Sequence, residues 1–319
     1  MRTARWRTCM PELAIVTYLR GQERLTPELI DIGNQLHRRY PGLVMELYVE
    51  STETVPAPGA DFPIRVTHVQ GTKYRKLLHA LHGAAHRYLL SLDNDIAADI
   101  PGLLRLVAQT VDGDFDLGWG RIHSRRVSSF ISRLVEVDKL LSHTVLRPAL
   151  WRLHLGVTIP GQCFLLKAAS FQGSLPGTDT FLDDLSIGLH AAKHRLRYHY
   201  AQEVVAFELP SYSFAALWKQ RSRWATGFRQ SLSCATLTRQ DRRLLWIHAF
   251  CYHLLPILHV AALAVLAPQA PQACAGWLGI LALAMARHRP QALGAALAYP
   301  VLFPLFHVGW WLHFFHVKS

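Results

Sequence analysis

Three short groups of polar residues in this chain have the composition of a catalytic site. In chain order they are Asp93 with Asp95, Asp183 with Asp184, and Gln220 with Arg223 and Trp224. Paired carboxylates offer hard oxygen ligands for Mg²⁺ or Mn²⁺, and a bound ion can hold a diphosphate. A single Asp-x-Asp pair is most often a solvated turn, so the order of the three groups is more informative than any one of them.

The first group comes directly after the apolar run 89–92. A short apolar run bounded by polar residues predicts a buried strand. Ligands of an open α/β sheet bind at the carboxyl ends of its strands. Asp93 and Asp95 are therefore expected at the edge of a sheet where ligands can reach them.

The chain that must position these groups alternates between strand and helix patterns. The expected strands are 14–19, 44–49, 64–69, the strand ending at Asp93, 117–122, 161–166 and 198–207. The expected helices begin at Pro27 with Thr26 as N-cap, and include 73–85, 101–111, 127–141 and 181–194. This alternation predicts an α/β fold with a doubly wound, mostly parallel sheet and right-handed crossovers.

The last third of the chain differs in composition from the rest. The net charge is +12, yet no charged residue stands between Arg243 and Arg287. The apolar segments 244–267 and 292–315 are each long enough for a bilayer crossing of about 20 residues, and 274–286 is marginal. We expect two or three membrane spans, with the basic residues of 239–243 and 287–289 on the cytoplasmic side. A buried helical subdomain is less consistent with this lack of acidic residues.

The remaining composition excludes several other classes of protein. The five cysteines are scattered and lack Cys-x-x-Cys spacing, which indicates neither a disulfide framework nor a zinc site. The basic surplus lies beside an apolar tail, so it favours a membrane face or phosphate-bearing substrates. No interleaved aromatic and basic platform for single-stranded nucleic acid is apparent, and we expect no nucleic-acid partner.

The ordered groups resemble the family 2 inverting glycosyltransferases. Their pattern is Asp-x-Asp, a later Glu-Asp or Asp-Asp pair, and Gln-x-x-Arg-Trp, here Gln220–Trp224. The resemblance covers roughly residues 12–232 and is most specific at Gln-x-x-Arg-Trp. It points to the membrane-bound branch, which includes cellulose, chitin and hyaluronan synthases and ceramide glucosyltransferase. It implies a GT-A type fold followed by an interfacial helix and transmembrane helices.

The resemblance implies a role for the acidic residues and the arginine of the three groups. Asp95 is expected to bind Mg²⁺ or Mn²⁺, and Asp93 to hold the nucleotide and share the ion, which stabilises the charge of the leaving diphosphate. Asp184 falls at the position of the general base. Asp183 is expected to orient that base, or else to act as a favourable charge at a helix N-terminus. Arg223 is expected to bind diphosphate oxygens during catalysis.

Other assignments follow from the same resemblance. Nucleotide contacts are expected at Thr17, Tyr18 and Glu50, and Lys76 is expected to reach the diphosphate. The usual Asn-Glu after the first strand and Asp-Asp-Gly-Ser after the second are absent. The acceptor site is expected to include Trp224, Gln220, Gly161 and Gln162. An aromatic sector of Phe214, Leu217, Trp218 and Phe228 favours a helix in the membrane interface.

These observations predict three parts: a catalytic domain in 1–210, interfacial helices in 211–243 and a membrane domain in 244–319. The expected activity is inverting transfer of a sugar from a nucleoside-diphosphate sugar, with a UDP-sugar favoured, to a lipid-linked or membrane-proximal acceptor. The catalytic domain is expected to face the cytoplasm at the cell membrane. A processive polysaccharide synthase is the alternative, and it would need an oligomer or a partner channel. A non-catalytic membrane scaffold is a further alternative.

Overall fold

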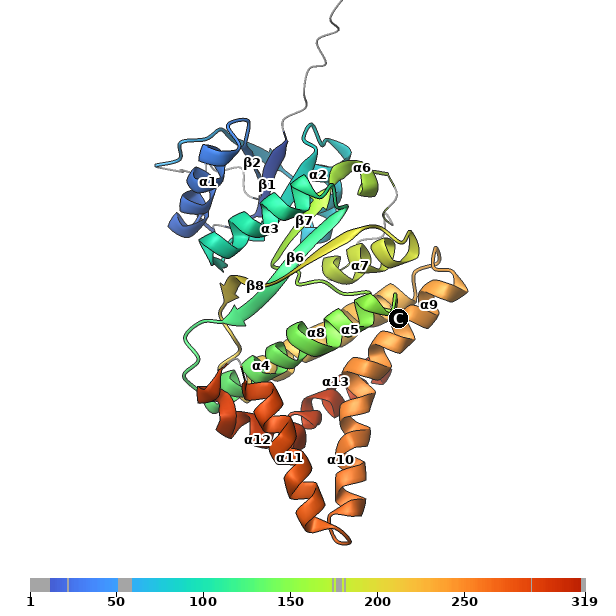
Figure 1. Cartoon of the computed structure of the whole chain (residues 1–319). Coiled ribbons are helices and arrows are strands. Elements are labelled where there is room, and N and C mark those ends of the chain that lie inside the picture. Colours follow the sequence, from blue (N-terminus) through green and yellow to red (C-terminus); the bar gives the residue numbers. More distant parts are fainter. Residues whose placement is uncertain are drawn as a thin grey trace, which may run out of the picture.

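The computed structural model describes residues 12–21, 23–50, 59–173, 175, 180, 182–287 and 289–316. A mixed sheet with flanking helices forms one end of the molecule, and a group of helices forms the other (Figure 1). The long helix α8 (Phe214–Leu232) lies between these two parts. The described chain thus has an α/β part and a helical part.

The sheet has eight strands in the order β3-β2-β1-β4-β7-β6-β8-β5. Their bounds are β1 Leu13–Tyr18, β2 Val44–Val49, β3 Ile64–His68, β4 Tyr88–Asp93, β5 Ala97–Ala98, β6 Leu117–Ser124, β7 Cys163–Lys167 and β8 Tyr198–Glu208. The first four strands in this order are parallel to one another, and β6 is parallel to β8. β7 runs antiparallel to both of its neighbours, β4 and β6, so the sheet is mostly parallel but mixed.

The reversed direction of β7 has a consequence for the site. In the antiparallel pairing Leu92 of β4 lies opposite Cys163, the first residue of β7. The segment just before β7, which contains Gly161 and Gln162, therefore meets the carboxyl end of β4. A parallel strand would have brought its last residues to this edge instead.

Helices cover both faces of the sheet. One face packs against α1 (Pro27–Arg39) and α3 (Ile100–Asp112), and the other against α2 (Lys73–His82), α6 (Ala168–Phe171) and α7 (Asp183–Lys193). The apolar side chains that α1 turns toward the sheet are all buried, namely Leu29, Ile30, Ile32 and Leu36. Thr26 is the N-cap residue of α1, but its hydroxyl donates to the carbonyl of Asn94 at 3.0 Å rather than capping the helix.

The next long helix differs from expectation at both ends. α4 (Phe130–Leu141) begins three residues later than predicted, because Ser129 and Ser132 form a reciprocal capping box. The helix then continues through a π-helical turn, Ser142–Leu146, into α5 (Arg147–Arg152). Side-chain periodicity does not reveal such a turn in advance.

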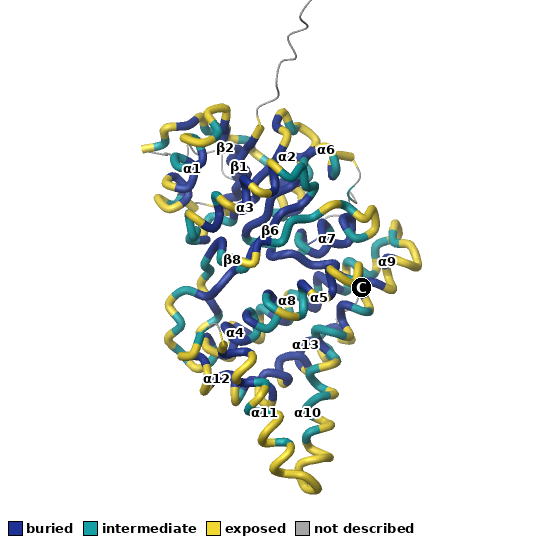
Figure 2. Tube along the Cα trace, in the orientation of Figure 1, coloured by how far each residue is buried: buried dark blue, intermediate teal, exposed yellow. Residues whose placement is uncertain are grey.

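The apolar tail forms several connected helices. α9 (Arg239–Ala249), a π-turn (Phe250–Leu254) and α10 (Leu255–Leu266) make one 28-residue helix that is long and apolar enough to cross a membrane. After α11 (Pro271–Ala286) and a 3₁₀ turn (Pro290–Ala292), α12 (Leu293–Leu302) and α13 (Pro304–His316) form a pair bent by 42°. The bend falls at Pro304, which has no backbone N–H to continue the helical hydrogen bonds. Figure 2 shows α10 and α11 projecting as a hairpin with an exposed tip.

Candidate functional site

A largely buried lysine contacts two of the three predicted groups. Lys73 Nζ lies 2.7 Å from Asp93 Oδ1 and 3.2 Å from Asp183 Oδ2. Burial by itself lowers the pKa of Lys73, but the carboxylates of Asp183 and Asp93 outweigh it and hold the pKa above its ordinary value. The ammonium therefore stays charged between the two acidic groups, which are 90 residues apart in sequence.

The loop before β7 holds this cluster together. The carbonyl of Gly161 accepts a hydrogen bond from Lys73 Nζ, and the carbonyl of Gln162 accepts one from the Asp93 backbone amide at 3.0 Å. A Cβ on Gly161 would lie 3.4 Å from the Cβ of Asp184. Gly161 and Gln162 thus lie beside both acidic pairs, at the edge where they were expected to line an acceptor site.

The two aspartates at the start of α7 differ in their surroundings. Asp183 is buried and is tied to Lys73, whereas Asp184 is half-buried and no described residue forms an ion pair with it. Burial raises the pKa of Asp184 to about 7, the charge of Asp183 adds to the rise, and Arg147 opposes it. A carboxyl group with a pKa near neutrality can take up a proton at physiological pH and release it again.

Asp95 lies two residues beyond the end of β4 and is exposed to solvent. Desolvation by the surrounding protein raises its pKa, and the nearby charge of Asp93 raises it further. Such repulsion between carboxylates is relieved by a divalent cation. Among the described residues, no group of three His, Cys, Asp or Glu side chains forms a complete metal cage. Asp93 and Asp95 fit an ion of the Mg²⁺ type, which commonly takes one or two carboxylates and completes its shell with phosphates and water.

The residues expected to contact the nucleotide lie at the ends of β1 and β2. Thr17 and Tyr18 are buried in the sheet, and the Tyr18 hydroxyl is 3.1 Å from Ser91 Oγ. Lys76 is also buried, and its ammonium binds Glu50 at 2.9 Å and the carbonyl of Leu19 at 3.3 Å.

The lysine beside Asp93 is therefore Lys73, which was not selected from the sequence, and not Lys76. A sequence signal for Lys73 does exist. It is the first residue of α2, and that helix starts at the carboxyl edge of the sheet after β3. A cation at this point lies at the same edge as the carboxylates of Asp93 and Asp95.

α8 carries the third group next to α7. A Cβ on Gly227 would lie 2.7 Å from Cγ of Leu182, so the glycine allows the start of α7 to pack closely on α8. Trp224, one turn earlier, is partly buried in the same cluster as Leu182. Gln220 is half-buried with Oε1 3.4 Å from Ser211 Oγ, and Arg223 is exposed. In the described part of the chain, no ion pair joins Arg223 to the aspartates.

The aromatic sector of α8 is only partly as expected. Phe214 and Trp218 are exposed and stacked on each other, which suits an interfacial position. Leu217 and Phe228 are fully buried in the protein interior. Their burial shows that this side of α8 packs against protein helices, and the interfacial assignment of these two side chains was wrong.

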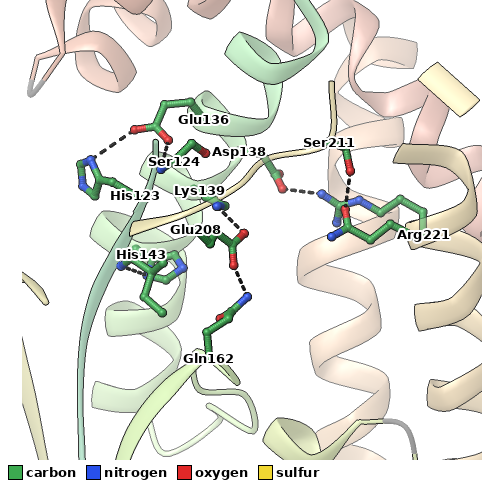
Figure 3. A network of polar contacts seen from close by, with 12 residues as sticks. His123, Ser124, Glu136, Asp138, Lys139, His143, Gln162, Glu208, Ser211 and Arg221 are labelled. Atoms are coloured by element: carbon green, nitrogen blue, oxygen red, sulfur yellow. Dashed lines mark hydrogen bonds and ion pairs between the residues drawn. The ribbon is translucent and has the colours of Figure 1, made fainter. Parts of the chain in front are cut away.

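A partly buried ion pair joins α8 to α4 (Figure 3). Arg221 Nη2 binds Asp138 Oδ2 of α4 at 2.6 Å. The Tyr299 hydroxyl of α12 donates to Asp138 Oδ1 at 2.7 Å. The Arg221 guanidinium also stacks 4.4 Å from the Trp224 ring. Removing one partner of a buried pair strands a charge, so this contact fixes α8 relative to α4 and α12.

A second set of polar contacts begins at the loop before β7. Glu208 at the end of β8 accepts from the Gln162 amide and forms an ion pair with Lys139 of α4 (Figure 3). Of these three residues, Gln162 belongs to the predicted acceptor site. Lys139 and Glu208 were not predicted as site residues from the sequence. These contacts connect the predicted acceptor site to α4, the helix that also carries Asp138.

The profile of the family described as "Glycosyl transferase family group 2" matches residues 90–287 of the chain. This match spans more than half of the sequence. The chain belongs to this family. It is a nucleotide-sugar-dependent glycosyltransferase with a GT-A-like mixed sheet and C-terminal helices. A search of curated proteins gives no match.

Several solved structures resemble the chain in fold. The mannosyltransferase PcManGT from Pyrobaculum calidifontis, solved with GDP-Man and Mn²⁺, is 16% identical with a TM-score of 0.55, and the match covers 98% of this chain and 89% of that one. Glucosyl-3-phosphoglycerate synthase from Mycobacterium tuberculosis, solved with Mn²⁺, UDP-Glc and phosphoglyceric acid, is 16% identical with a TM-score of 0.47, covering 68% and 78%. S. aureus TarS 1-349 is 12% identical with a TM-score of 0.46, covering 93% and 86%. At these identities the likeness to PcManGT concerns the fold alone.

Proposed function

We propose that this protein is a membrane-bound inverting glycosyltransferase. It takes a sugar from a nucleoside-diphosphate sugar, with a UDP-sugar favoured, and attaches it to a hydroxyl of a lipid-linked or membrane-proximal acceptor. The observation that carries the proposal is the contact of one ammonium group, Lys73 Nζ, with both Asp93 and Asp183. That contact brings the Asp-x-Asp group and the Asp-Asp pair into one site.

On the donor side, Asp93 and Asp95 would hold a divalent ion, and the ion in turn would bind the oxygens of the diphosphate. The ion, when bound, supplies positive charge that stabilises the leaving nucleoside diphosphate. Lys73 adds a second positive charge beside Asp93. The nucleotide base and ribose are expected near Thr17, Tyr18 and Glu50 at the ends of the first two strands, with Lys76 orienting Glu50.

Asp184 acts as the general base and Asp183 as its neighbour. The carboxylate of Asp183 is already bound to Lys73, while that of Asp184 has a pKa of about 7 and reaches solvent. Asp184 removes the proton of the acceptor hydroxyl as that oxygen attacks the anomeric carbon. Attack on the face opposite the leaving diphosphate inverts the anomeric configuration.

The acceptor side is formed by Gly161, Gln162, Gln220 and Trp224. Trp224 lies over the start of α7 and presents an aromatic face to a sugar or lipid headgroup. Arg223 is exposed on the same helix and is expected to bind the diphosphate once donor occupies the site. Donor binding would thus draw α8 and the two acidic pairs together.

The helical tail is proposed to anchor the enzyme in a bilayer with the catalytic part on the cytoplasmic side. In the most apolar part of the 28-residue helix only 11% of residues are buried, so most of its apolar side chains are at least partly exposed. Exposed side chains of α11, including Ile280 and Leu283, are similarly uncovered. Contiguous exposed apolar surface of this kind suits lipid.

The raised pKa of Asp184 predicts how activity depends on pH. A base must be unprotonated, so kcat/KM should fall as the pH decreases through about 7. Asp183→Asn removes one cause of the raised pKa and should move this acidic limb to lower pH. The measurement is kcat/KM across pH 5–9 for both proteins. An unchanged limb in the variant would contradict the assignment of Asp184 as the titrating base.

Trp224→Ala should impair use of the acceptor more than hydrolysis of the donor. The ring lies at the junction of α7 and α8, so its loss removes a packing surface for the acceptor while leaving Asp93 and Asp95 in place. The rates of acceptor glycosylation and of donor hydrolysis are compared in the same samples. Trp246→Ala, a second partly exposed tryptophan on α9, serves as control. An equal effect on both rates would contradict an acceptor role.

The function itself is tested by activity of the purified full chain in detergent. The protein is incubated with Mn²⁺, a lipid extract and a panel of sugar nucleotides, and release of nucleoside diphosphate is measured. We expect one donor to be turned over, and its product to carry the inverted anomeric configuration by NMR. Retention of configuration, or no turnover with any donor, would contradict the proposal.

A further inference from the structure

A polar cavity of about 370 Å³ lies apart from the acidic pairs, between the sheet and the apolar helices. Its wall includes Arg121 of β6, Arg152 of α5 and Arg287, which directly follows α11. None of the described residues that line it carries a carboxylate. Three arginines from three separate elements therefore face one space.

The neutral residues of the wall complement these cations. Thr144, Tyr200 and Gln202 also line the cavity and carry hydroxyl or amide groups. Arg121 Nε donates to Tyr200 Oη at 3.2 Å, and that hydroxyl in turn donates to the backbone carbonyl of His143. The guanidinium of Arg121 is thus held in a fixed orientation, and an anion could bind it without first ordering the side chain.

The surrounding charge is positive as well. Burial lowers the pKa of His143 well below its ordinary value, and the charges of Arg147, Lys139 and Arg121 lower it further. His143 is therefore neutral and adds no charge of its own beside the cavity. Planar guanidinium groups arranged in this way suit the oxygens of a phosphate.

The position of the cavity indicates which kind of phosphate-bearing ligand it suits. Arg287 stands at the end of α11, the apolar helix whose outward side chains have no protein cover. Val145, which is 52% exposed, lies at the cavity wall, and the 65% exposed Leu153 follows at the end of α5. A ligand with an anionic head and an apolar tail would satisfy both surfaces.

We propose that this cavity binds the phosphate of an anionic phospholipid headgroup at the cytoplasmic surface of the bilayer. The inference uses the membrane placement proposed above, but it does not depend on the assignment of catalytic residues. The lipid would fix the height of α4 and α5 relative to the membrane. It would be a bound lipid separate from donor and acceptor, because Asp93 and Asp184 do not line the cavity.

The test is native mass spectrometry of the full-length protein in detergent. Dioleoyl-phosphatidylglycerol, dioleoyl-phosphatidylcholine and sodium phosphate are titrated separately. An arginine near an anionic lipid surface contributes about a fivefold factor in affinity, so Arg152→Gln with Arg287→Gln should weaken phosphatidylglycerol binding about 25-fold. Arg38→Gln with Arg39→Gln, exposed on α1, makes the same charge change elsewhere and should leave it unaltered.

A second variant keeps the proposal testable if the double arginine variant does not fold. Val145→Glu adds a negative charge at an exposed position and keeps every arginine, and it should also weaken phosphatidylglycerol binding. Equal binding of phosphatidylglycerol by all variants would overturn the proposal, as would equal binding of the two lipids by the wild type. Phosphate binding as tightly as phosphatidylglycerol would identify a free-phosphate site instead. Sugar-nucleotide turnover, measured in parallel, separates this outcome from failure of the proposed enzyme activity.

Discussion

Asp184→Asn is expected to lower the rate of sugar transfer by about 10²–10⁴-fold, the usual contribution of a general base. Asparagine has nearly the same shape as aspartate, so the packing of Asp184 beside Gly161 should persist. Donor binding should be nearly intact, because the ammonium of Lys73 contacts Asp93 and Asp183 and not the mutated residue. Transfer is measured under single turnover, and donor binding by calorimetry with nucleoside diphosphate and Mn²⁺.

Asp31→Asn is a suitable control for that experiment. Asp31 is exposed on α1, on the far face of the sheet, and its loss removes the same charge from the chain. Its transfer rate should equal that of the wild type. Loss of donor binding in Asp184→Asn, or transfer at the wild-type rate, would remove Asp184 from the role of base.

Asp95→Ala is expected to weaken donor binding in the presence of Mn²⁺ by at least about 100-fold. Changes to outer-shell partners of a metal already cost about 10–100-fold, and Asp95 is proposed to touch the ion directly. The variant should also lose most of its dependence on Mn²⁺, because the one carboxylate that remains, Asp93, is already paired with Lys73. Binding of the nucleoside diphosphate is measured with Mn²⁺ and with chelator.

Asp112→Ala provides the matched control, since Asp112 is an exposed aspartate at the end of α3. It should bind donor as the wild type does. In chelator the wild type should bind as weakly as Asp95→Ala. Full activity of the wild type in chelator would refute the metal role of both aspartates.

The ion pairs of α4 suggest how the catalytic part and the helical tail are kept in register. Asp138 binds Arg221 of α8 and Tyr299 of α12, and Glu136 on the same helix lies 3.2 Å from Arg289. α4 thus contacts the helix bearing Gln220–Trp224 and the start of the last apolar segment. A helix held on both sides in this way can place an acceptor from the bilayer close to the sheet edge.

Local patterns were sufficient for most of the secondary structure. β2 has the predicted bounds Val44–Val49, and α1 begins at the predicted Pro27. Strands and helices follow from hydrophobic periodicity and capping residues, because both signals lie in short stretches of neighbouring residues. The ordered acidic and Arg-Trp groups likewise indicated the family, because their order along the chain is itself a property of the sequence.

The tertiary structure alone decided which lysine serves the acidic pairs and how Gly161 meets them. Lys73 and Lys76 are one helical turn apart and equally basic, and only the packing of α2 on the sheet turns Lys73 toward Asp93 and Lys76 toward Glu50. The reversed direction of β7, which brings the loop before it beside Asp93, depends on pairing with both neighbouring strands. Contacts between residues far apart in sequence leave no local pattern, so these features could not be read from the chain before it was folded.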